Sequence, residues 1–144
     1  HSLRRRQRQM CIRDSIKCGV NSESIGVISP FRAQRSLVVE MLKEEGIRIE
    51  VNTVDAFQGR EKDVIIFSIT DTSDLKFPSD PHRLNVAFTR ARRKLIVLGN
   101  ARVIVEKAKV DKEFREKNLL YKFLSYCWEK ESIFLWESKS WARR

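Results

Sequence analysis

The sequence predicts an α/β domain built around a mostly parallel sheet. From Ser24 onward, short apolar runs alternate with amphipathic segments, and neither internal repeats nor low-complexity stretches interrupt this alternation. Strands separated by helical segments are typical of βα units, which build parallel sheets. The chain has 144 residues, enough for one compact domain with its own core.

The first part of the chain predicts two strands and the helix between them. The run IGVIS at 25–29 is apolar enough for a buried strand, and IRIEV at 47–51 is the second strand. The helix expected over 31–45 is bounded by Pro30 and, at its C-terminal cap position, by Gly46. Four of its apolar residues recur at helical spacing: Leu37, Val38, Met41 and Leu42.

The middle of the chain predicts a turn, a central strand and the start of a second helix. The turn follows the second strand, since Asp55 and Gln58 have the spacing of a capping box. Residues 63–70 (DVIIFSIT) begin with an apolar run, as in a central strand that is covered on both faces. Asp80 followed by Pro81 predicts a helix that begins with a side-chain cap and a proline in its first position.

The last part predicts the rest of that helix, a strand, a long helix and a final strand. The stripe that should face the sheet consists of Leu84, Ala87, Phe88 and Ala91. A strand is expected over 94–99 (KLIVLG), a helix over about 111–130 and a last strand over 132–137 (SIFLWE). In parallel sheets ligands collect beyond the carboxyl ends of the strands, so the loops there are the first place to seek a site.

The charge of the chain predicts a polyanionic partner. The formal net charge is +10 at pH 7, for which nucleic acid is the simplest partner. No apolar run approaches the about 18 residues that a membrane-spanning helix needs, so we expect no membrane partner. Three cysteines without a C-x-x-C pair and two histidines support neither a disulfide framework nor a metal site. We therefore expect an intracellular protein.

The first fifteen residues differ in character from the rest. Residues 1–15 contain five arginines and one aspartate. We expect this segment to be non-native or disordered, because RQRQMCIRDS resembles translated sequencing-adapter text and like-charge runs are usually disordered tails. The alternative is a basic arm that binds phosphates. The domain itself is then expected over 16–138, followed by a tail over 139–144.

A basic stretch without carboxylates, RLNVAFTRARRKLIVLG, spans residues 83–99. Arg92, Arg93 and Lys94 stand where the expected helix ends, and cations there complement the helix dipole. Arg90 lies a full turn further back. Its planar guanidinium could bind a phosphate oxygen there and neutralise charge during phosphoryl transfer.

Two further segments carry groups suited to a nucleotide. Gly59 and Glu61 stand between two expected strands; a glycine lets a ligand approach the backbone, and a carboxylate can accept from ribose hydroxyls. The alternative there is a plain strand connection with a solvated charged turn. Phe31 could stack on a base and Arg32 reach a phosphate. The alternative is that Phe31 packs under the helix.

Three segments in this order carry a family resemblance. GVISPFRAQ, VNTVDAFQGREKDVII and RLNVAFTRARRKLIVLGN resemble motifs IV, V and VI of superfamily 1B helicases, in the branch with the regulator of nonsense transcripts and senataxin. The resemblance covers residues 25–100. It implies the second of two RecA-like domains that clamp ATP between them and move along single-stranded RNA or DNA, typically 5′ to 3′.

The resemblance also implies roles for single residues. Phe31 stands at the position of an aromatic that stacks on adenine, although the family often has tyrosine there, and Arg32 at that of an arginine on the γ-phosphate. Gly59 and Glu61 match motif V positions that line the phosphates and ribose. Arg90 matches the arginine finger of motif VI.

The nucleic-acid contacts implied by the resemblance come from two segments. Thr53 stands where motif V touches the nucleic-acid backbone. Arg92 and Arg93 serve either the helix end or the phosphate backbone.

Parts that such a motor needs do not occur in this sequence. It contains neither a G-x-x-x-x-G-K-[ST] loop nor a D-E pair after an apolar strand. The resemblance therefore implies ATP as cofactor, with Mg²⁺ held mainly by a first, N-terminal RecA-like domain outside this chain. The fragment alone is expected to be a monomer that neither hydrolyses ATP nor unwinds nucleic acid.

Two other functions stay open. A non-catalytic nucleic-acid-binding module with a RecA-like fold would bind in a salt-dependent way without any effect of ATP. A nuclease is suggested only by an E-x-K tripeptide, Glu137 to Lys139, for which no partner aspartate is evident.

Overall fold

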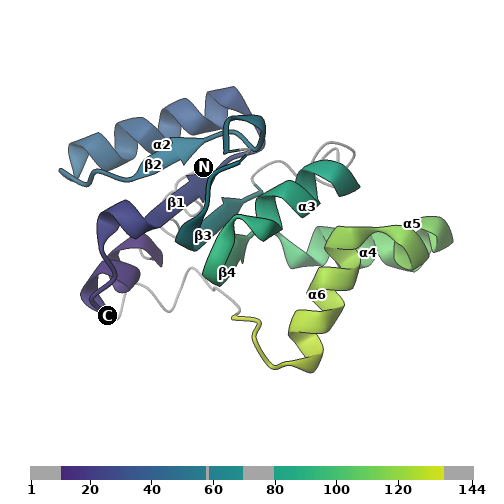
Figure 1. Cartoon of the computed structure of the whole chain (residues 1–144). Coiled ribbons are helices and arrows are strands. Elements are labelled where there is room, and N and C mark those ends of the chain that lie inside the picture. Colours follow the sequence, from purple (N-terminus) through teal and green to yellow (C-terminus); the bar gives the residue numbers. More distant parts are fainter. Residues whose placement is uncertain (1–10, 58, 70–79, 135–144) are drawn as a thin grey trace. The chain divides into compact units, whose positions relative to one another are not determined.

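The computed structural model describes residues 11–57, 59–69 and 80–134 (Figure 1). The chain forms two compact units, the first ending at Asn100 and the second beginning at Ala101. The predicted division into a domain over 16–138 and a tail over 139–144 stays a prediction, and the tail lies outside the described residues.

The first unit is built on a four-stranded, all-parallel sheet in the order β2-β1-β3-β4. Helices flank this sheet, so the predicted α/β class is confirmed, and the arrangement is consistent with a RecA-like helicase domain. In chain order its elements are η1 (Ser22–Ser24), β1 (Ile25–Ile28), α2 (Arg32–Glu44), β2 (Glu50–Asn52), η2 (Asp55–Phe57), β3 (Lys62–Ser68), α3 (Pro81–Thr89) and β4 (Ala91–Leu98).

Strand β3 is covered on both faces, as its apolar sequence predicted. Val64 and Ile66 point to one face and belong to a hydrophobic cluster with the buried residues of α2. Phe67 points to the other face and meets Phe88 of α3 edge-on, with ring centroids 6.0 Å apart and planes at 80°. Apolar contacts on both faces fix this strand at the centre of the unit.

Helix α2 has nearly the predicted bounds, and its end confirms the role expected for Gly46. Gly46 has φ +68°, its amide donates to the Lys43 carbonyl (3.1 Å), and the Ile47 amide donates to the Leu42 carbonyl (2.9 Å). This is a Schellman cap, which only a left-handed residue closes without strain. Of the four apolar residues at helical spacing, Val38, Met41 and Leu42 are buried, whereas Leu37 is 55% exposed.

Residues 11–17 are helical, which differs from the disorder expected for residues 1–15. Ile12 is fully buried in the same cluster as α2, and the Arg13 guanidinium forms an ion pair with Glu45 at the end of α2. The burial of one isoleucine therefore anchors this part of the basic segment. Residues 1–10 lie outside the described residues, and whether the segment is native stays a prediction.

The start of α3 is the predicted one. The Asp80 side chain accepts hydrogen bonds from the amides of His82 (2.9 Å) and Arg83 (3.1 Å), and Pro81 occupies the first turn. The carboxylate satisfies two amides that have no partner inside the helix, and the proline has no amide to satisfy. Leu84 is buried beneath this turn, as predicted.

The end of α3 differs from the prediction. The helix ends at Thr89, Arg90 is its C-cap, and β4 begins directly at Ala91, beside Lys62 of β3. Three cations expected at the helix end lie in the strand instead, because this segment pairs with β3: Arg92, Arg93 and Lys94.

Strand β2 also differs from the prediction. It begins at Glu50 rather than at residue 47, after the cap of α2.

The second unit consists of three helices, α4 (Ala101–Val110), α5 (Lys112–Lys117) and α6 (Leu119–Glu129). One helix was expected over 111–130, but it is broken because the Asn118 side chain caps α6 by accepting from the Tyr121 amide (3.1 Å). Helix α4 was not predicted. Residues 132–134 are not in a strand, and the rest of the strand expected over 132–137 lies outside the described residues. No helix in the described part of the chain is long and apolar enough to cross a membrane.

Candidate functional site

The predicted site residues lie at two opposite edges of the parallel sheet. Phe31 and Arg32 follow β1 and Thr53 follows β2, so these three lie at the carboxyl edge. Glu61 precedes β3 and Arg90 precedes β4, so both lie at the amino edge. The two edges are separated by the length of β3, because Ile28 pairs with Phe67 whereas Ala91 pairs with Lys62, five residues or about 16 Å away.

This separation bears on two predicted roles. Arg32 and Arg90, for both of which the resemblance implies a contact with the terminal phosphate of ATP, lie at opposite edges of the described sheet. Phe31 and Glu61 likewise lie at opposite edges, and the roles predicted for these four residues stay predictions. Arg92 and Arg93, in the amino-terminal half of β4, are likewise separated from Thr53, because β2 and β4 form the two outer strands of the described sheet.

The carboxyl edge presents the start of α2. The Ser29 amide donates to the Asn52 carbonyl (3.0 Å) and so joins the ends of β1 and β2. Phe31 is the half-buried N-cap residue of α2 and supplies no side-chain cap to the helix amides. Arg32 is exposed, and its guanidinium makes no hydrogen bond or ion pair with another described residue. An uncapped helix start beside a free guanidinium favours an anion.

A buried polar contact that the sequence did not reveal holds α2 in place. Gln34 is 94% buried, and its Nε2 donates to both the carbonyl and the hydroxyl of Ser68 (3.2 Å each) at the end of β3. A glutamine in an amphipathic helix is ordinarily assigned to the exposed face, so spacing alone gave no signal for this contact. The bond ties the first turn of α2 to the carboxyl edge of the sheet.

Arg90, at the amino edge, is held by neutral groups. Its Nε donates to the Val86 carbonyl (3.2 Å), its Nη2 to the Thr89 hydroxyl (3.2 Å) and its Nη1 to the Arg60 carbonyl (3.4 Å). The side chain is half-buried, and it forms no ion pair with a carboxylate in the described part of the chain. Its positive charge is therefore fixed in position but not neutralised.

Other arginines of the basic stretch are neutralised by carboxylates from elsewhere in the sequence. The Arg92 Nε lies 3.0 Å and the Arg93 Nε 3.9 Å from one oxygen of Asp63, and Arg83 lies 3.6 Å from Asp55. The register explains the shared partner: between the paired positions on either side, β4 has two residues where β3 has only Asp63. This is a β-bulge, and it lets both arginines approach one carboxylate.

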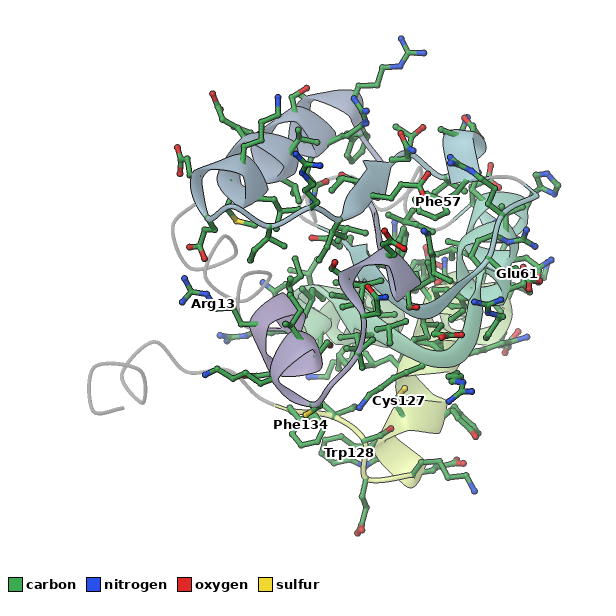
Figure 2. All side chains as sticks on the ribbon, turned by 60° about the vertical axis from the view of Figure 1, so that its left-hand side comes forward. Arg13, Phe57, Glu61, Cys127, Trp128 and Phe134 are labelled. Atoms are coloured by element: carbon green, nitrogen blue, oxygen red, sulfur yellow. The ribbon has the colours of Figure 1, made fainter. Side chains whose placement is uncertain are left out.

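The segment before β3 holds the neighbourhood of Arg90 in place. The Arg60 side chain forms an ion pair with Glu50, donates to the Ala56 carbonyl (2.6 Å) and lies over the ring of Phe57, 5.2 Å from its centroid. Glu61 is exposed (Figure 2). Gly59 has φ +79° and no protein atom within 4 Å of where its Cβ would be, so the turn requires glycine for its conformation.

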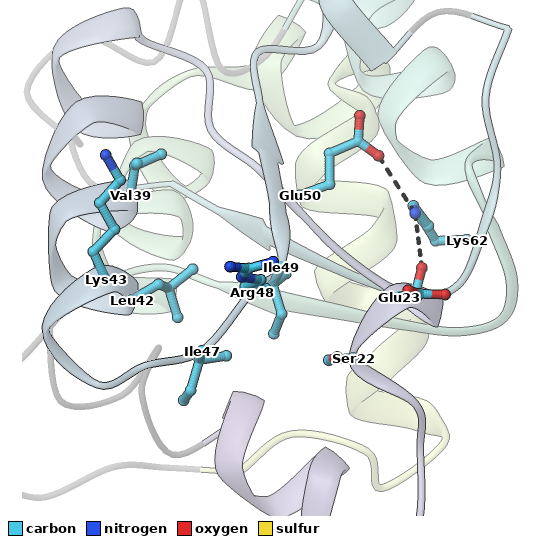
Figure 3. Close-up of a pocket in the computed structure, with 10 residues that line it drawn as sticks. All are labelled: Ser22, Glu23, Val39, Leu42, Lys43, Ile47, Arg48, Ile49, Glu50 and Lys62. Carbon is cyan, nitrogen blue, oxygen red and sulfur yellow. Dashed lines mark hydrogen bonds and ion pairs between the residues drawn. The ribbon is translucent and has the colours of Figure 1, made fainter.

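A hollow of about 630 Å³ lies beside the amino end of β2 (Figure 3). Val39, Leu42 and Ile47 form part of its apolar wall, and on its rim Lys62 pairs with Glu50 (3.4 Å) and donates to the Glu23 carbonyl (2.7 Å). None of its lining residues was predicted to be functional. The hollow therefore adds nothing to the candidate site.

The acidic residues near Arg90 do not fit a magnesium ion. Glu50 and Asp63 are engaged by arginines, and within 11–57, 59–69 and 80–134 no three His, Cys, Asp or Glu side chains gather into a metal site. Mg²⁺ prefers several oxygen ligands in octahedral geometry. The described acidic residues at this edge therefore do not form a metal site.

Comparison with known proteins gives the family. Residues 7–102 match the family model of the AAA domain. The ATP-dependent helicase upf1 of Schizosaccharomyces pombe is 40% identical over 125 residues, which cover 80% of this chain and 12% of that protein. The ATP-dependent helicase NAM7 of Saccharomyces cerevisiae is 41% identical over 115 residues, covering 71% and 12%.

A third relative agrees with these two. The Regulator of nonsense transcripts 1 homolog of Drosophila melanogaster is 41% identical over 101 residues, covering 63% of this chain and 9% of that protein. The chain thus spans only about a tenth of the length of these relatives. The chain belongs to the AAA domain family, and two of these three relatives are named as ATP-dependent helicases.

Proposed function

We propose that this chain is the C-terminal motor half of an ATP-dependent helicase, and that the two edges of its sheet serve two ligands. The amino edge, with Arg90 and Glu61, contributes to the ATP site. The carboxyl edge, with Phe31, Arg32 and Thr53, contacts single-stranded RNA or DNA. Movement from 5′ to 3′, an intracellular location and a monomeric state belong to the same proposal.

The observation that carries this proposal is that the Arg90 guanidinium has only neutral hydrogen-bond acceptors among the described residues. A cation whose hydrogen bonds go to neutral acceptors still attracts an anionic ligand with its whole positive charge. The charges of Arg92 and Arg83 are instead partly offset by carboxylate partners. In phosphoryl transfer, an arginine finger stabilises the charge that builds up on the transferred phosphoryl group. Arg90 is thus the member of the basic stretch best prepared for that role, with Gly59 as the turn that leads to Glu61.

The first domain is proposed to complete the ATP site. Bound Mg²⁺ would neutralise the phosphates there. The chain's own residues would add a cation at the terminal phosphate and a carboxylate, Glu61, that accepts from the ribose hydroxyls. Phe31 and Arg32, displaced from this site by the length of β3, would instead offer a stacking face and a phosphate contact to a nucleic-acid strand.

A test of Arg90 requires the complete helicase. Arg90→Ala should lower the ATPase kcat by about 10³-fold or more, because an arginine finger is worth about 10³ to 10⁵ in rate, while binding of a non-hydrolysable ATP analogue is largely retained. Arg48→Ala, at an exposed arginine without a predicted role, is the matched control and should retain wild-type turnover. Near-normal hydrolysis by Arg90→Ala would overturn the assignment.

A separate test addresses the carboxyl edge. Arg32→Ala should weaken binding to a single-stranded oligonucleotide and reduce the slope of log K against log salt by about 0.7, the value expected for one lost phosphate contact. The KM for ATP should not change. A raised KM for ATP with an unchanged salt slope would return Arg32 to the ATP site.

The same measurements test the alternative function. Salt-dependent binding with no ATPase activity in the complete protein would favour the non-catalytic nucleic-acid-binding module.

A further inference from the structure

We propose that Thr89 is a positioning residue for Arg90, because its hydroxyl orients the guanidinium so that one N–H of each terminal nitrogen is left for a phosphate. This inference rests on the proposed function, in which Arg90 acts at the ATP site. Nothing in the sequence singled out Thr89, and the family comparison gives it no role.

The count of donors supports this assignment. A guanidinium has five N–H groups, one on Nε and two on each terminal nitrogen. In Arg90, Nε donates to Val86, one N–H of Nη1 to Arg60 and one N–H of Nη2 to Thr89. Among the described residues, one N–H on each terminal nitrogen is therefore left over. Where these are the two N–H groups that face away from Nε, they are parallel and form the fork that binds two oxygens of one phosphate.

The hydroxyl of Thr89 suits this role because it is itself fixed. Its Oγ1 lies 2.8 Å from the Asn85 carbonyl and 3.2 Å from the Val86 carbonyl, to either of which it can donate. A hydroxyl has one proton and two lone pairs, so once its proton points to the helix, a lone pair is available for Nη2 of Arg90. The helix thereby fixes the acceptor, and the acceptor fixes the rotation of the guanidinium.

The other two bonds do not replace this one. The Val86 carbonyl holds Nε, at the inner end of the group, and the contact from Nη1 to the Arg60 carbonyl is the longest of the three at 3.4 Å. Without the Thr89 hydroxyl, only the Val86 and Arg60 carbonyls would hold the plane of the guanidinium, and the longer bond to Arg60 is the weaker of the two. Loss of orientation should affect the reaction more than the binding of ATP, since transition-state stabilisation depends on geometry.

The experiment compares two substitutions of Thr89 in the complete helicase. Thr89→Val keeps the β-branched shape and removes the hydroxyl, and it should lower kcat about 10-fold with little change in the KM for ATP. Thr89→Ser keeps the hydroxyl and should stay within about twofold of the wild type. Ser36→Ala removes a hydroxyl bonded to a carbonyl one turn back in α2, away from Arg90, and serves as the matched control.

A double-mutant cycle separates positioning from a purely structural effect. If Thr89 acts through Arg90, Thr89→Val should cause no further loss of kcat in an Arg90→Ala background. An equal loss in both backgrounds, or a Thr89→Ser variant as slow as Thr89→Val, would overturn the inference. A normal Arg90→Ala enzyme would instead overturn the proposed function, so the two failures are distinguishable.

Discussion

Gly26, in the middle of β1, determines how closely the segment before β3 can cross the sheet. A Cβ at this position would lie 2.8 Å from Cζ of Phe57, 3.1 Å from Cδ1 of Ile65 and 3.1 Å from Cγ of Lys62. Phe57 is fully buried, so moving it would disturb the packing around it, whereas the long Lys62 side chain is only half-buried. Gly26→Ala is therefore expected to overpack this contact.

The size of the effect follows from two opposing terms. Overpacking a close-packed core costs about 1 to 3 kcal/mol, and replacing glycine by alanine regains about 0.4 to 1 kcal/mol by restricting the unfolded chain. The net loss for Gly26→Ala is then about 1.5 kcal/mol, which lowers the melting temperature by about 5 °C in a chain of this length. Gly99→Ala is the control, because its nearest contact, Cβ of Ile69 at 3.5 Å, is ordinary.

Thermal and urea unfolding of the two variants would measure this difference. A second substitution, Phe57→Leu, should cost less in the Gly26→Ala background than in the wild type, since the smaller side chain relieves the overlap. If Gly26→Ala is as stable as Gly99→Ala, the close crossing of Phe57 over β1 is wrong. The support of Arg60 by the Phe57 ring would then be in doubt as well.

Three further predictions concern stability and reactivity. Ile12→Ala should destabilise the chain by about 2 to 5 kcal/mol in urea unfolding and Ile16→Ala by much less, because the first side chain is fully buried and the second is 37% exposed; equal effects would contradict the packing of residues 11–17. Asp80→Ala should cost about 1 kcal/mol by the same assay, since two amides of α3 lose their acceptor, and an unchanged midpoint would contradict the cap. Burial raises the pKa of the Cys11 thiol, so iodoacetamide at pH 8 should modify exposed Cys18 faster; mass spectrometry showing the reverse order would contradict the burial of Cys11.

Local patterns predicted the elements whose causes are local. The cap formed by Asp80 and Pro81 depends on neighbours in the sequence, and the left-handed cap at Gly46 depends on one residue type. The continuous apolar run of β3 predicted a strand that is buried on both faces. In the two caps the residues that make the contact lie within a few positions of one another, whereas for β3 only the apolar run is local and its contacts come from α2 and α3.

The parts that could not be predicted depend on contacts between distant segments. The pairing of Arg92 and Arg93 with Asp63 joins positions about thirty residues apart, and no spacing rule indicates it. The separation between Arg32 and Arg90 could not be predicted for the same reason. The order of the motifs along the chain does not tell at which edge of the sheet each motif lies. The end of α3 was misplaced for a related reason: pairing with β3 determines it, and no glycine or proline marks it.

The extra residue in β4 also decides which way the rest of that strand faces. The bulge opposite Asp63 adds one residue to β4, so each side chain after it points to the opposite face from the one it would otherwise take. Ile96 and Leu98 therefore pack against the hydrophobic cluster. Replacing Arg92 or Arg93 would change a surface charge and leave this orientation intact. Deleting either one would remove the bulge and exchange the two faces of the apolar residues that follow, 95–98, so the facing of this end of the strand depends on the number of residues in the bulge and not on their charge.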